Sequence, residues 1–434
     1  MELPTVSIVV LSYNSAEHLH DCFPSLLALD YPRERVELVL ADNASADGSV
    51  AYVREHFRGV RILEFDQNYG FCAGNNRAAA LVESEFVAFL NPDMRVEPGW
   101  LKALLAALGD EPGVVCASSK VLAWNGEALD FAGLLLSFVG HCRADGYGEH
   151  DLAAYDDVRY ILGPIGGAML IDRRLFLAIG GFDEDFVAYF DDVDLGWRLW
   201  ILGYKVVFAP KSICYHVHYG SFSKEAECKI LYLYERNALY TIVKNYEQQY
   251  LDRVLPIALL LHVKRAYLYA LMSGADMESC RFRLAPADGS KAGPIRYDVR
   301  YYLAEAGRTL RQDGVRALAR KALDELDRRR GRPVSQIVPT AAAVERAYAD
   351  IEHAHLAATN DLVENYASVL ARRAWIQARR QRSDQEIFST VPALSFDVCF
   401  DTPEYRETQQ RLIQLFGIPE LFGEVYDPDV PFAL

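Results

Sequence analysis

The 434-residue sequence lacks several features that mark out whole classes of protein. Its first residues, MELPTVSIVV, contain no basic segment and no small-residue cleavage pattern, so we expect no signal peptide. The eight cysteines are scattered and no two form a CxxC pair, which argues against a cysteine metal site or redox motif. The simplest interpretation is a cytoplasmic protein with reduced thiols.

Positive charge is also scarce. The 45 Lys and Arg residues face 60 Asp and Glu residues, which gives a formal net charge of −15. A chain of this charge is poorly suited to bind a polyanion, so we expect no nucleic-acid partner. The composition, 51% hydrophobic and 24% charged, is that of an ordinary globular protein and excludes a disordered chain.

No long apolar run is free of charged residues. The longest, Val254–Met272, is interrupted by His262, Lys264 and Arg265. A charged side chain at the centre of a bilayer costs roughly 2.5–3.5 kcal/mol on insertion scales. We therefore expect no transmembrane span here, whereas a helix lying on the membrane surface stays compatible with the pattern.

The N-terminal part alternates strand and helix patterns. Val6–Tyr13 is a nearly continuous apolar run, typical of a strand buried on both faces, and Ala16–Leu29 has helical apolar spacing. Further strands are expected at Val36–Ala41, Val60–Phe65, Phe86–Leu90 and Val114–Ser118, with helices at Ser49–Phe57, Ala73–Val82 and Trp100–Leu108. This alternation predicts βαβ units and an α/β fold with a parallel sheet.

After residue 138 the strand–helix alternation is interrupted by a polar segment, and from residue 223 it gives way to a helical pattern. Val139–Tyr160 is polar and glycine-containing, which predicts a long loop, and strands at Gly166–Ile171 and Lys205–Ala209 flank a helix at Asp191–Leu202. From residue 223 the pattern is helical, and Pro286–Pro294 reads as a hinge. We therefore predict a catalytic domain at 1–222, a helical extension at 223–290 and a helical C-terminal region at 291–434.

That C-terminal region is basic over 299–382 and acidic over 383–434. Opposite charges in neighbouring segments favour a contact between them, within one chain or between two copies in a homo-oligomer. Two solvated surfaces explain the same pattern equally well.

Polar residues follow the first two strands, at the edge where α/β sheets bind ligands. Tyr13 follows the first strand, and Asp42 ends the second, where its carboxylate can accept a hydrogen bond from a base N–H. Ser45 and Asp47, a few residues later, are better explained as caps of the next helix.

Two more motifs follow the third and fourth strands. Asn68 begins a turn that includes Gly70 and Asn75 and opens a helix, whose free N–H groups favour an anion. The fourth strand is followed by Asn91-Pro92-Asp93, in which Asp93 can hold a hard divalent cation beside phosphate oxygens.

Taken in order, these strand ends resemble those of family 2 glycosyltransferases with the GT-A fold. The resemblance runs from Val6 to about Tyr246 and includes GGFDE at 180–184, YFDDVDL at 189–195, Trp197-Arg198 and Tyr215-His216. The rhamnosyltransferase-like and galactofuranosyltransferase-like members are most similar, and they usually read NPD where other families read DXD. The resemblance implies a Rossmann-like, mixed and mostly parallel sheet flanked by helices, followed by a mainly α-helical C-terminal region.

The resemblance also implies roles for individual residues. Tyr13 would pack on the nucleobase and Asp42 would hydrogen-bond its ring N–H. Asp93 would ligate Mn2+ or Mg2+, and His216 would complete the metal shell, with His218 as a second candidate. The remaining positions expected to bind the nucleotide sugar are Asn68, Gly70, Asn75 and Asn91. Asn91 replaces the first acid of DXD, which predicts metal binding that is weaker or depends on the donor diphosphate.

The acidic cluster at 191–194 needs separate treatment. We expect Asp191 to be the N-cap of its helix with Asp194 at N3, and Asp194 to pair with Arg198 one turn later. Asp192 has no such structural partner. The general base of the family stands at this position, so Asp192 is expected to deprotonate the acceptor hydroxyl.

The sequence therefore predicts a metal-dependent, inverting glycosyltransferase. Its donor would be a nucleoside-diphosphate sugar, dTDP-rhamnose or a UDP-sugar, and its acceptor a glycan or lipid-linked glycan of a surface or secreted polysaccharide. The expected location is cytoplasmic, including the inner face of the membrane. Phe182 and Tyr189 are expected to touch a sugar, and Glu235-Arg236-Asn237 also occurs in the similar proteins.

Two alternatives stay open. A nucleotidyltransferase shares the nucleotide-binding sheet, but it would normally carry a glycine-rich loop with a basic residue after the first strand, which Leu11–Asn14 lacks. A degenerate transferase that acts as a binding scaffold is favoured by Asn91. The presence of Asp42, Asp93, Asp192 and His216 together argues against the scaffold.

Overall fold

The computed structural model describes residues 3–217, 227–272, 341–391, 397 and 402–422. Two compact units are present: Met1–Lys264 with Ala354–Tyr426, and Arg265–His353 with Asp427–Leu434. The predicted boundaries after residues 222 and 290, the hinge at Pro286–Pro294 and His218 all lie outside the described residues, as does half of the basic segment 299–382. The domain limits stay a prediction.

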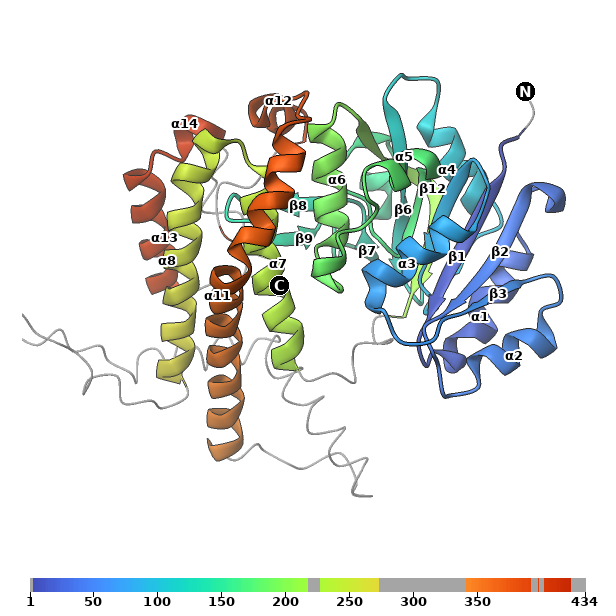
Figure 1. The fold of residues 1–434 in the computed structure, drawn as a ribbon, viewed down its shortest axis with the longest axis horizontal. Coiled ribbons are helices and arrows are strands. Elements are labelled where there is room, and N and C mark those ends of the chain that lie inside the picture. The colour runs from blue at the N-terminus through green and yellow to red at the C-terminus, as the bar shows by residue number, and fades with distance from the viewer. Residues whose placement is uncertain (1–2, 218–226, 273–340, 392–396, 398–401, 423–434) are drawn as a thin grey trace, which may run out of the picture. The chain divides into compact units, whose positions relative to one another are not determined.

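The main sheet is mixed and, within the described residues, contains ten strands in the order β10-β12-β6-β11-β4-β1-β2-β3, with β5 beside β12 and β7 beside β6 (Figure 1). Its strands are β1 (Val6–Ser12), β2 (Val36–Asp42), β3 (Arg61–Glu64), β4 (Phe86–Leu90), β5 (Met94–Val96), β6 (Val114–Ala123), β7 (Leu129–Phe131), β10 (Arg159–Tyr160), β11 (Ala168–Asp172) and β12 (Lys205–His216). A separate hairpin pairs β8 (Leu134–Leu136) with β9 (Cys142–Ala144).

Helices cover both faces of this sheet. They are α1 (Ala16–Leu27), α2 (Ser49–His56), α3 (Gly70–Leu81), α4 (Trp100–Leu108), α5 (Arg173–Ala178) and α6 (Asp191–Ile201). Because strand side chains alternate, Ile8 and Val10 of β1 pack in one core with α1, α2 and α4. On the opposite face Phe89 of β4 packs against Phe176 of α5. A mixed sheet flanked by helices, as expected, is confirmed.

Strand directions bring the expected functional residues to one edge. Strands β1, β2 and β4 are mutually parallel. Strand β11 is antiparallel to both β4 and β6, so β4 and β6 run the same way, and β12 is parallel to β6. The carboxyl ends of β1, β2, β4 and β12 therefore meet at the same edge of the sheet, which is where such sheets place their ligands.

The structure departs from the sequence expectations in two segments. The polar stretch Val139–Tyr160 is not one loop, because it contains β9, a short 3-10 helix at Leu152–Tyr155 and β10. The last strand does not stop at Ala209 but continues to His216, with a register shift against β6 between Ala209 and Ile213. This irregular register interrupts the apolar alternation, which is why sequence pattern alone shortened the strand.

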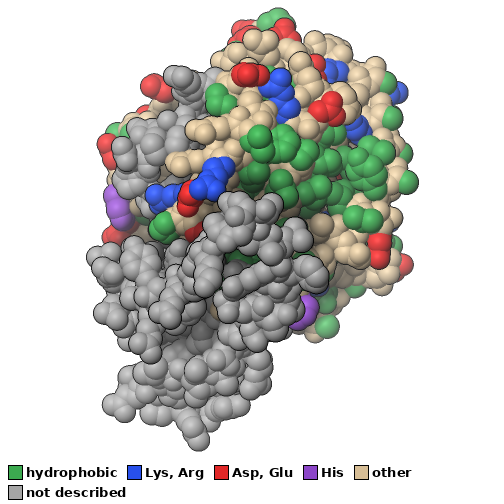
Figure 2. All heavy atoms as spheres, turned by 90° about the vertical axis from the view of Figure 1, so that its left-hand side faces the viewer, with side chains coloured by type: hydrophobic (Ala, Val, Ile, Leu, Met, Phe, Trp, Pro, Cys, Tyr) green, Lys and Arg blue, Asp and Glu red, His purple; other side chains and the backbone are tan. Residues whose placement is uncertain are grey.

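The described C-terminal region is helical, as expected: α7 (Glu227–Asn245), α8 (Gln248–Met272), α11 (Ala341–Gln377), α12 (Asp384–Thr390), α13 (Pro403–Leu415) and α14 (Pro419–Phe422). Helix α8 is long and apolar enough to cross a membrane, and half of its apolar stretch is buried, as is also found for core helices of soluble proteins. Figure 2 shows hydrophobic side chains gathered on part of one face of the molecule. Exposed apolar residues of this region include Leu260 and Val263 of α8 and Leu415 of α13.

Candidate active site

Tyr13 and Asp42 offer complementary surfaces at the ends of β1 and β2. Tyr13 is 44% exposed, so its ring is open to stacking. Asp42 is only 4% exposed; its Oδ2 accepts a hydrogen bond from the Ser45 N–H at 3.0 Å, while its Oδ1 has no hydrogen-bond partner among the described residues. A buried carboxylate oxygen without a partner is costly, so this atom is ready to accept an N–H from a ligand. Asp47 instead accepts bonds from the N–H groups of Ser49 and Ala16 and fixes the local turn.

The turn before α3 differs from the expectation of free N–H donors. The Asn68 side chain accepts from the Gly70 N–H at 2.8 Å, and the carbonyl of Val187 accepts from the N–H groups of Phe71 at 3.0 Å and Cys72 at 3.2 Å. An anion would have to displace these acceptors, so the predicted open anion site is wrong. The reason is tertiary: the Val187 carbonyl arrives from a loop far along the chain.

Asn75 also has a structural partner at this turn, because its side-chain amide donates to the Phe71 carbonyl within α3. Gly70 has a positive φ of 76°, and a Cβ there would lie 3.2 Å from Val187 Cγ1. A part in donor binding for Asn68, Gly70 and Asn75 stays a prediction.

Asp93 and His216 lie side by side, as the register of β5 on β12 requires. Met94 is opposite His216, so Asp93 sits at the end of β12, and its Oδ2 is 3.4 Å from His216 Nε2. The other ring nitrogen, Nδ1, is 2.7 Å from Oδ2 of Asp130 on β7. Burial alone would lower the pKa of His216, but hydrogen bonds to Asp130 and Asp93 raise it to about 9. Sequence reasoning missed Asp130, because no local motif marks it.

These residues fit a divalent cation. Asp93 is 8% exposed, and its Oδ1 has no hydrogen-bond partner among the described residues, which leaves a buried acceptor for an ion. With Nδ1–H of His216 donated to Asp130, the Nε2 lone pair faces the Asp93 carboxylate, the usual arrangement of a carboxylate-oriented histidine ligand. When the imidazole of His216 is doubly protonated, its Nε2 carries a proton that faces Asp93. A bound cation would take the place of that proton.

Asp192 stands in the first turn of α6 and is half-buried. Its Oδ2 accepts from the Gly166 N–H at 3.2 Å and its Oδ1 from the Val193 N–H at 2.8 Å. Burial raises the pKa of Asp192 despite these backbone bonds. The neighbouring Asp191 is more deeply buried, and its pKa is raised first by burial and then by the charge of Asp192. The expectation that Asp191 is the N-cap is wrong, because Phe190 holds that position in a left-handed conformation.

Two glycines connect Asp192 to the Asn91-Pro92-Asp93 turn. Gly166 donates its N–H to Asp192, and the Gly167 carbonyl accepts the N–H of Asn91 at 2.8 Å. A Cβ on Gly167 would lie 2.4 Å from Nδ2 of Asn91, so any larger residue would displace the Asn91 side chain. Consecutive residues of one short segment therefore fix the predicted base and the predicted metal motif beside one another.

Helix α6 is anchored by buried charges behind Asp192. Asp194 is fully buried and bonds Arg198 Nε at 2.7 Å, as predicted, and also Lys244 Nζ of α7 at 2.7 Å. Burial alone would raise the pKa of Asp194, but the charges and hydrogen bonds of Lys244 and Arg198 lower it to about 2. Both oxygens of Asp194 are thus engaged, and this carboxylate is unsuited to proton transfer.

The loop just before α6 has unusual backbone geometry. Val187, Tyr189 and Phe190 have φ values of 66°, 64° and 63°, in the left-handed region that non-glycine residues avoid. The side-chain amide of Asn237 in α7 reaches the carbonyls of Phe186, Ala188 and Tyr189 at 3.1, 2.9 and 2.8 Å. Asn237 belongs to the Glu235-Arg236-Asn237 motif, whose part in shaping this loop the sequence did not reveal.

One of the two aromatic predictions is wrong. Phe182 is fully buried and packs against Phe71, Phe89 and Phe176, so it cannot touch a sugar. Tyr189 is partly exposed, and its contact with a sugar stays a prediction.

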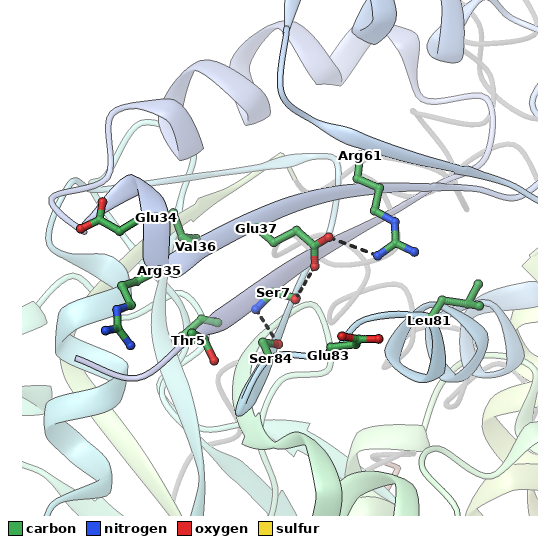
Figure 3. A pocket seen from close by; sticks show the side chains of 11 residues that line it. Thr5, Ser7, Glu34, Arg35, Val36, Glu37, Arg61, Leu81, Glu83 and Ser84 are labelled. Atoms are coloured by element: carbon green, nitrogen blue, oxygen red, sulfur yellow. Dashed lines mark hydrogen bonds and ion pairs between the residues drawn. The ribbon is translucent and has the colours of Figure 1, made fainter. Parts of the chain in front are cut away.

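A cavity of about 400 Å3 lies elsewhere, at the amino ends of the strands. Figure 3 shows Ser7, Glu37, Arg61 and Ser84 among its lining residues, with Glu37 bonded to Ser7 and Arg61. None of the predicted site residues lines this cavity. It is therefore separate from the candidate active site, which lies at the carboxyl ends.

The sequence is similar to those of proteins with known names. The chain is 28% identical over 232 residues to the N-acetylglucosaminyl-diphospho-decaprenol L-rhamnosyltransferase of Mycobacterium tuberculosis, covering 48% of this chain and 75% of that protein. It is 30% identical over 234 residues to the O-antigen biosynthesis protein RfbC of Myxococcus xanthus, covering 52% of this chain and 18% of that protein.

Among solved structures, the mannosyltransferase PcManGT of Pyrobaculum calidifontis in complex with GDP-Man and Mn2+ matches with a TM-score of 0.43 and 16% identity, covering 84% of this chain and 88% of that one. Residues 7–127 match the family model described as glycosyl transferase family 2. This matched segment holds the ends of β1, β2, β3 and β4, whose residues resemble the same family.

Proposed function

We propose that this protein is an inverting glycosyltransferase that moves a sugar from a nucleoside-diphosphate donor to a hydroxyl group of a glycan. The observation that carries the proposal is the meeting of Asp192 with the Asn91-Pro92-Asp93 turn through Gly166 and Gly167. A proton acceptor and a cation-binding carboxylate at one sheet edge are what a single displacement at an anomeric carbon needs.

On the donor side, Tyr13 stacks on the nucleobase and Asp42 Oδ1 accepts its ring N–H. Asp93 and His216 hold the divalent cation, Mn2+ or Mg2+, with His216 oriented by Asp130. The cation would neutralise negative charge on the departing nucleoside diphosphate. Support comes from the partnerless buried oxygens of Asp42 and Asp93 and from the exposure of Tyr13.

On the acceptor side, Asp192 accepts the proton of the attacking hydroxyl. Its raised pKa favours this role, because a general base works best when its pKa approaches the working pH. The hydrogen bonds from the Gly166 and Val193 N–H groups hold the carboxylate in place while it reacts. The attack and the departure occur in one step, so no enzyme nucleophile takes part.

We further propose that the donor is dTDP-rhamnose or a UDP-sugar and the acceptor a lipid-linked glycan. Support comes from the similarity to a rhamnosyltransferase whose name includes a decaprenol-linked sugar. The exposed apolar side chains of Leu260 and Val263 on α8 are suited to peripheral contact with the cytoplasmic face of a membrane.

The test is release of nucleoside diphosphate from a panel of UDP-, dTDP- and GDP-sugars, with Mn2+, Mg2+ or EDTA and a panel of glycan acceptors. We expect one donor to be turned over only with metal. Asp192→Asn should lower kcat by about 10²–10⁴-fold with donor binding retained. Asp93→Ala should abolish the response to metal, and Asp110→Asn, an exposed carboxylate at the end of α4, should change neither.

Asn91 favours the scaffold alternative, because an asparagine in place of the first acid of DXD removes one negative charge from the metal motif. A scaffold would bind donor without turnover on any acceptor, and Asp192→Asn would then leave every measured property unchanged. Absence of binding of any nucleotide sugar, with or without metal, would contradict the proposal altogether.

A further inference from the structure

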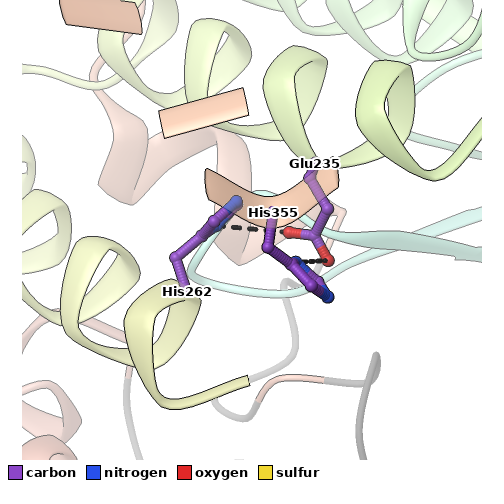
Figure 4. Close-up of side chains that lie close together, drawn as sticks. All are labelled: Glu235, His262 and His355. Carbon is purple, nitrogen blue, oxygen red and sulfur yellow. Dashed lines mark ion pairs between the residues drawn. The ribbon is translucent and has the colours of Figure 1, made fainter. Parts of the chain in front are cut away.

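A second group of metal-ligating side chains lies apart from Asp93 and His216, among the C-terminal helices. Glu235 of α7, His262 of α8 and His355 of α11 point toward one another (Figure 4). One ligand atom from each lies within 4.8 Å of the others, and each side chain is at most 2% exposed. Residues far apart in the sequence thus bring two imidazoles and a carboxylate to one buried point.

The distances match those between ligands of a tetrahedral ion. His262 Nδ1 is 3.2 Å from Glu235 Oε2, and His355 Nδ1 is 3.3 Å from Glu235 Oε1. Zinc–nitrogen bonds of about 2.0–2.1 Å place neighbouring donor atoms of a tetrahedron about 3.3 Å apart. Small side-chain adjustments would therefore bring these atoms onto one ion.

A third imidazole faces the same carboxylate. His141, in the turn between β8 and β9, has its Nε2 3.0 Å from Glu235 Oε2, and its Nδ1 is 2.8 Å from Asp397 Oδ1. The second oxygen of Asp397 accepts from the Tyr405 hydroxyl. A carboxylate on the far nitrogen of a histidine is the arrangement that orients metal-ligating imidazoles.

The charges around Glu235 are compatible with a cation at this point. An ionised carboxylate only accepts hydrogen bonds, and a neutral imidazole has a single N–H. If the Nδ1–H of His141 is donated to Asp397, the positive charge between its Nε2 and the Glu235 carboxylate, 3.0 Å away, is either a second imidazole proton or a metal ion. A divalent ion supplies that charge and balances the two buried carboxylates.

We propose that Glu235, His262 and His355 bind one divalent transition-metal ion such as zinc, and that His141, which contacts Glu235 but lies outside this three-residue group, shifts to become the fourth donor. Three imidazoles and one carboxylate favour zinc over Mg2+ or Ca2+, which take oxygen ligands. With His141 as the fourth donor, protein atoms would supply all four positions of a buried site, so we assign the metal a structural role.

The site has a consequence for the proposed active site. The ion would cross-link α7, α8, α11 and the β8–β9 turn. Glu235 directly precedes Arg236 and Asn237, which hold the loop before Asp192 by hydrogen bonds to its carbonyls. A metal ion bound to Glu235 would therefore restrain α7, the helix whose Arg236 and Asn237 hold that loop. This consequence rests on the proposed function, whereas metal binding itself does not.

The experiment measures metal content and not activity. The full chain, carrying no histidine tag, is expressed with added zinc, dialysed and analysed by inductively coupled plasma mass spectrometry. We expect about one zinc per chain in the wild type and at least a tenfold lower content in Glu235→Gln and His355→Gln. Asp397→Asn should weaken zinc binding by about 10–100-fold, because it removes the carboxylate that orients His141.

Two controls keep the test specific. His353→Gln alters an exposed histidine on the same helix as His355, and Asp93→Ala alters the proposed catalytic metal site; both should retain the zinc. Because a cluster variant can fail to fold, the wild type is also stripped with a chelator and titrated with Co2+. Visible ligand-field bands of four-coordinate cobalt, saturating at one ion per chain, are expected. A folded wild type with no bound zinc and no cobalt bands, or zinc lost equally from Asp93→Ala, would overturn the proposal.

Discussion

Replacing Asn237 by alanine removes the side chain that holds the loop before α6. Asn237 is fully buried, and its amide reaches the carbonyls of three loop residues. Three left-handed non-glycine residues in this loop cost about 1–2 kcal/mol each, or roughly 3–6 kcal/mol in total. The loop keeps this conformation because hydrogen bonds such as those of Asn237 offset the cost.

The size of the effect follows from the hydrogen bonds lost. The amide has two N–H groups to share among its acceptors. Each bond contributes about 1 kcal/mol, and a buried carbonyl left without a partner costs about 1–3 kcal/mol. We expect Asn237→Ala to lower the free energy of unfolding by about 2–4 kcal/mol. The relaxed loop would also shift Phe190 and with it Asp192, and a misplacement of about 1 Å lowers kcat by about 100-fold.

The assay combines urea unfolding with nucleoside diphosphate release at saturating donor. KM for the donor should change little, because Tyr13 and Asp42 lie on other elements. Thr241→Val, one turn later on α7, is the matched control; Thr241 is buried and its hydroxyl has no hydrogen-bond partner among the described residues. Asn237→Asp keeps the volume but replaces the donors by acceptors, so it should be at least as damaging as alanine. A kcat unchanged in both Asn237 variants would refute the reasoning.

Three further predictions concern the surrounding residues. Asp194→Asn should lower the free energy of unfolding by about 3–5 kcal/mol at pH 7, because it removes the carboxylate that pairs with buried Arg198 and leaves buried Lys244 with Asp183 alone. In denaturant titrations this difference from the wild type should shrink as the pH falls from 3.8 toward 2, where the lowered pKa of Asp194 lets the native carboxylate protonate; a constant difference would contradict the assignment. Gly167→Ala places a Cβ 2.4 Å from Asn91 Nδ2, so kcat should fall about 100-fold in a protein with an unchanged circular dichroism spectrum. Asp130→Asn should raise the Mn2+ concentration for half-maximal activity by about 10–100-fold, since the orienting partner of His216 is weakened, and an unaltered Mn2+ titration would argue against metal binding by His216.

Features encoded locally were predictable from the sequence. The buried strands, the helices between them and the polar strand ends follow from apolar periodicity, and the Asp194–Arg198 pair follows from helical spacing. Asp93 and His216 were expected near one another only through the family resemblance. The structure supplies the reason, which is the antiparallel register of β5 on β12.

Features that depend on long-range packing were not predictable. Asp130 reaches His216 only because β7 and β12 both pair with β6, and no local pattern marks it. The free donors expected at α3 are occupied by Val187, and the N-cap expected at Asp191 moved to Phe190 because the preceding loop is left-handed. In each case a contact between distant segments overrides a correct local rule.

The most direct test of the central claim is a crystal structure of the protein with Mn2+ and the nucleoside diphosphate of its donor. The account predicts an anomalous manganese peak within about 2.5 Å of the Asp93 carboxylate and of His216 Nε2, next to the diphosphate. It also predicts the nucleobase between Tyr13 and Asp42, with the Asp192 carboxylate open on the side where the sugar would lie. A nucleotide bound elsewhere, or manganese bound to the diphosphate without Asp93, would contradict the account.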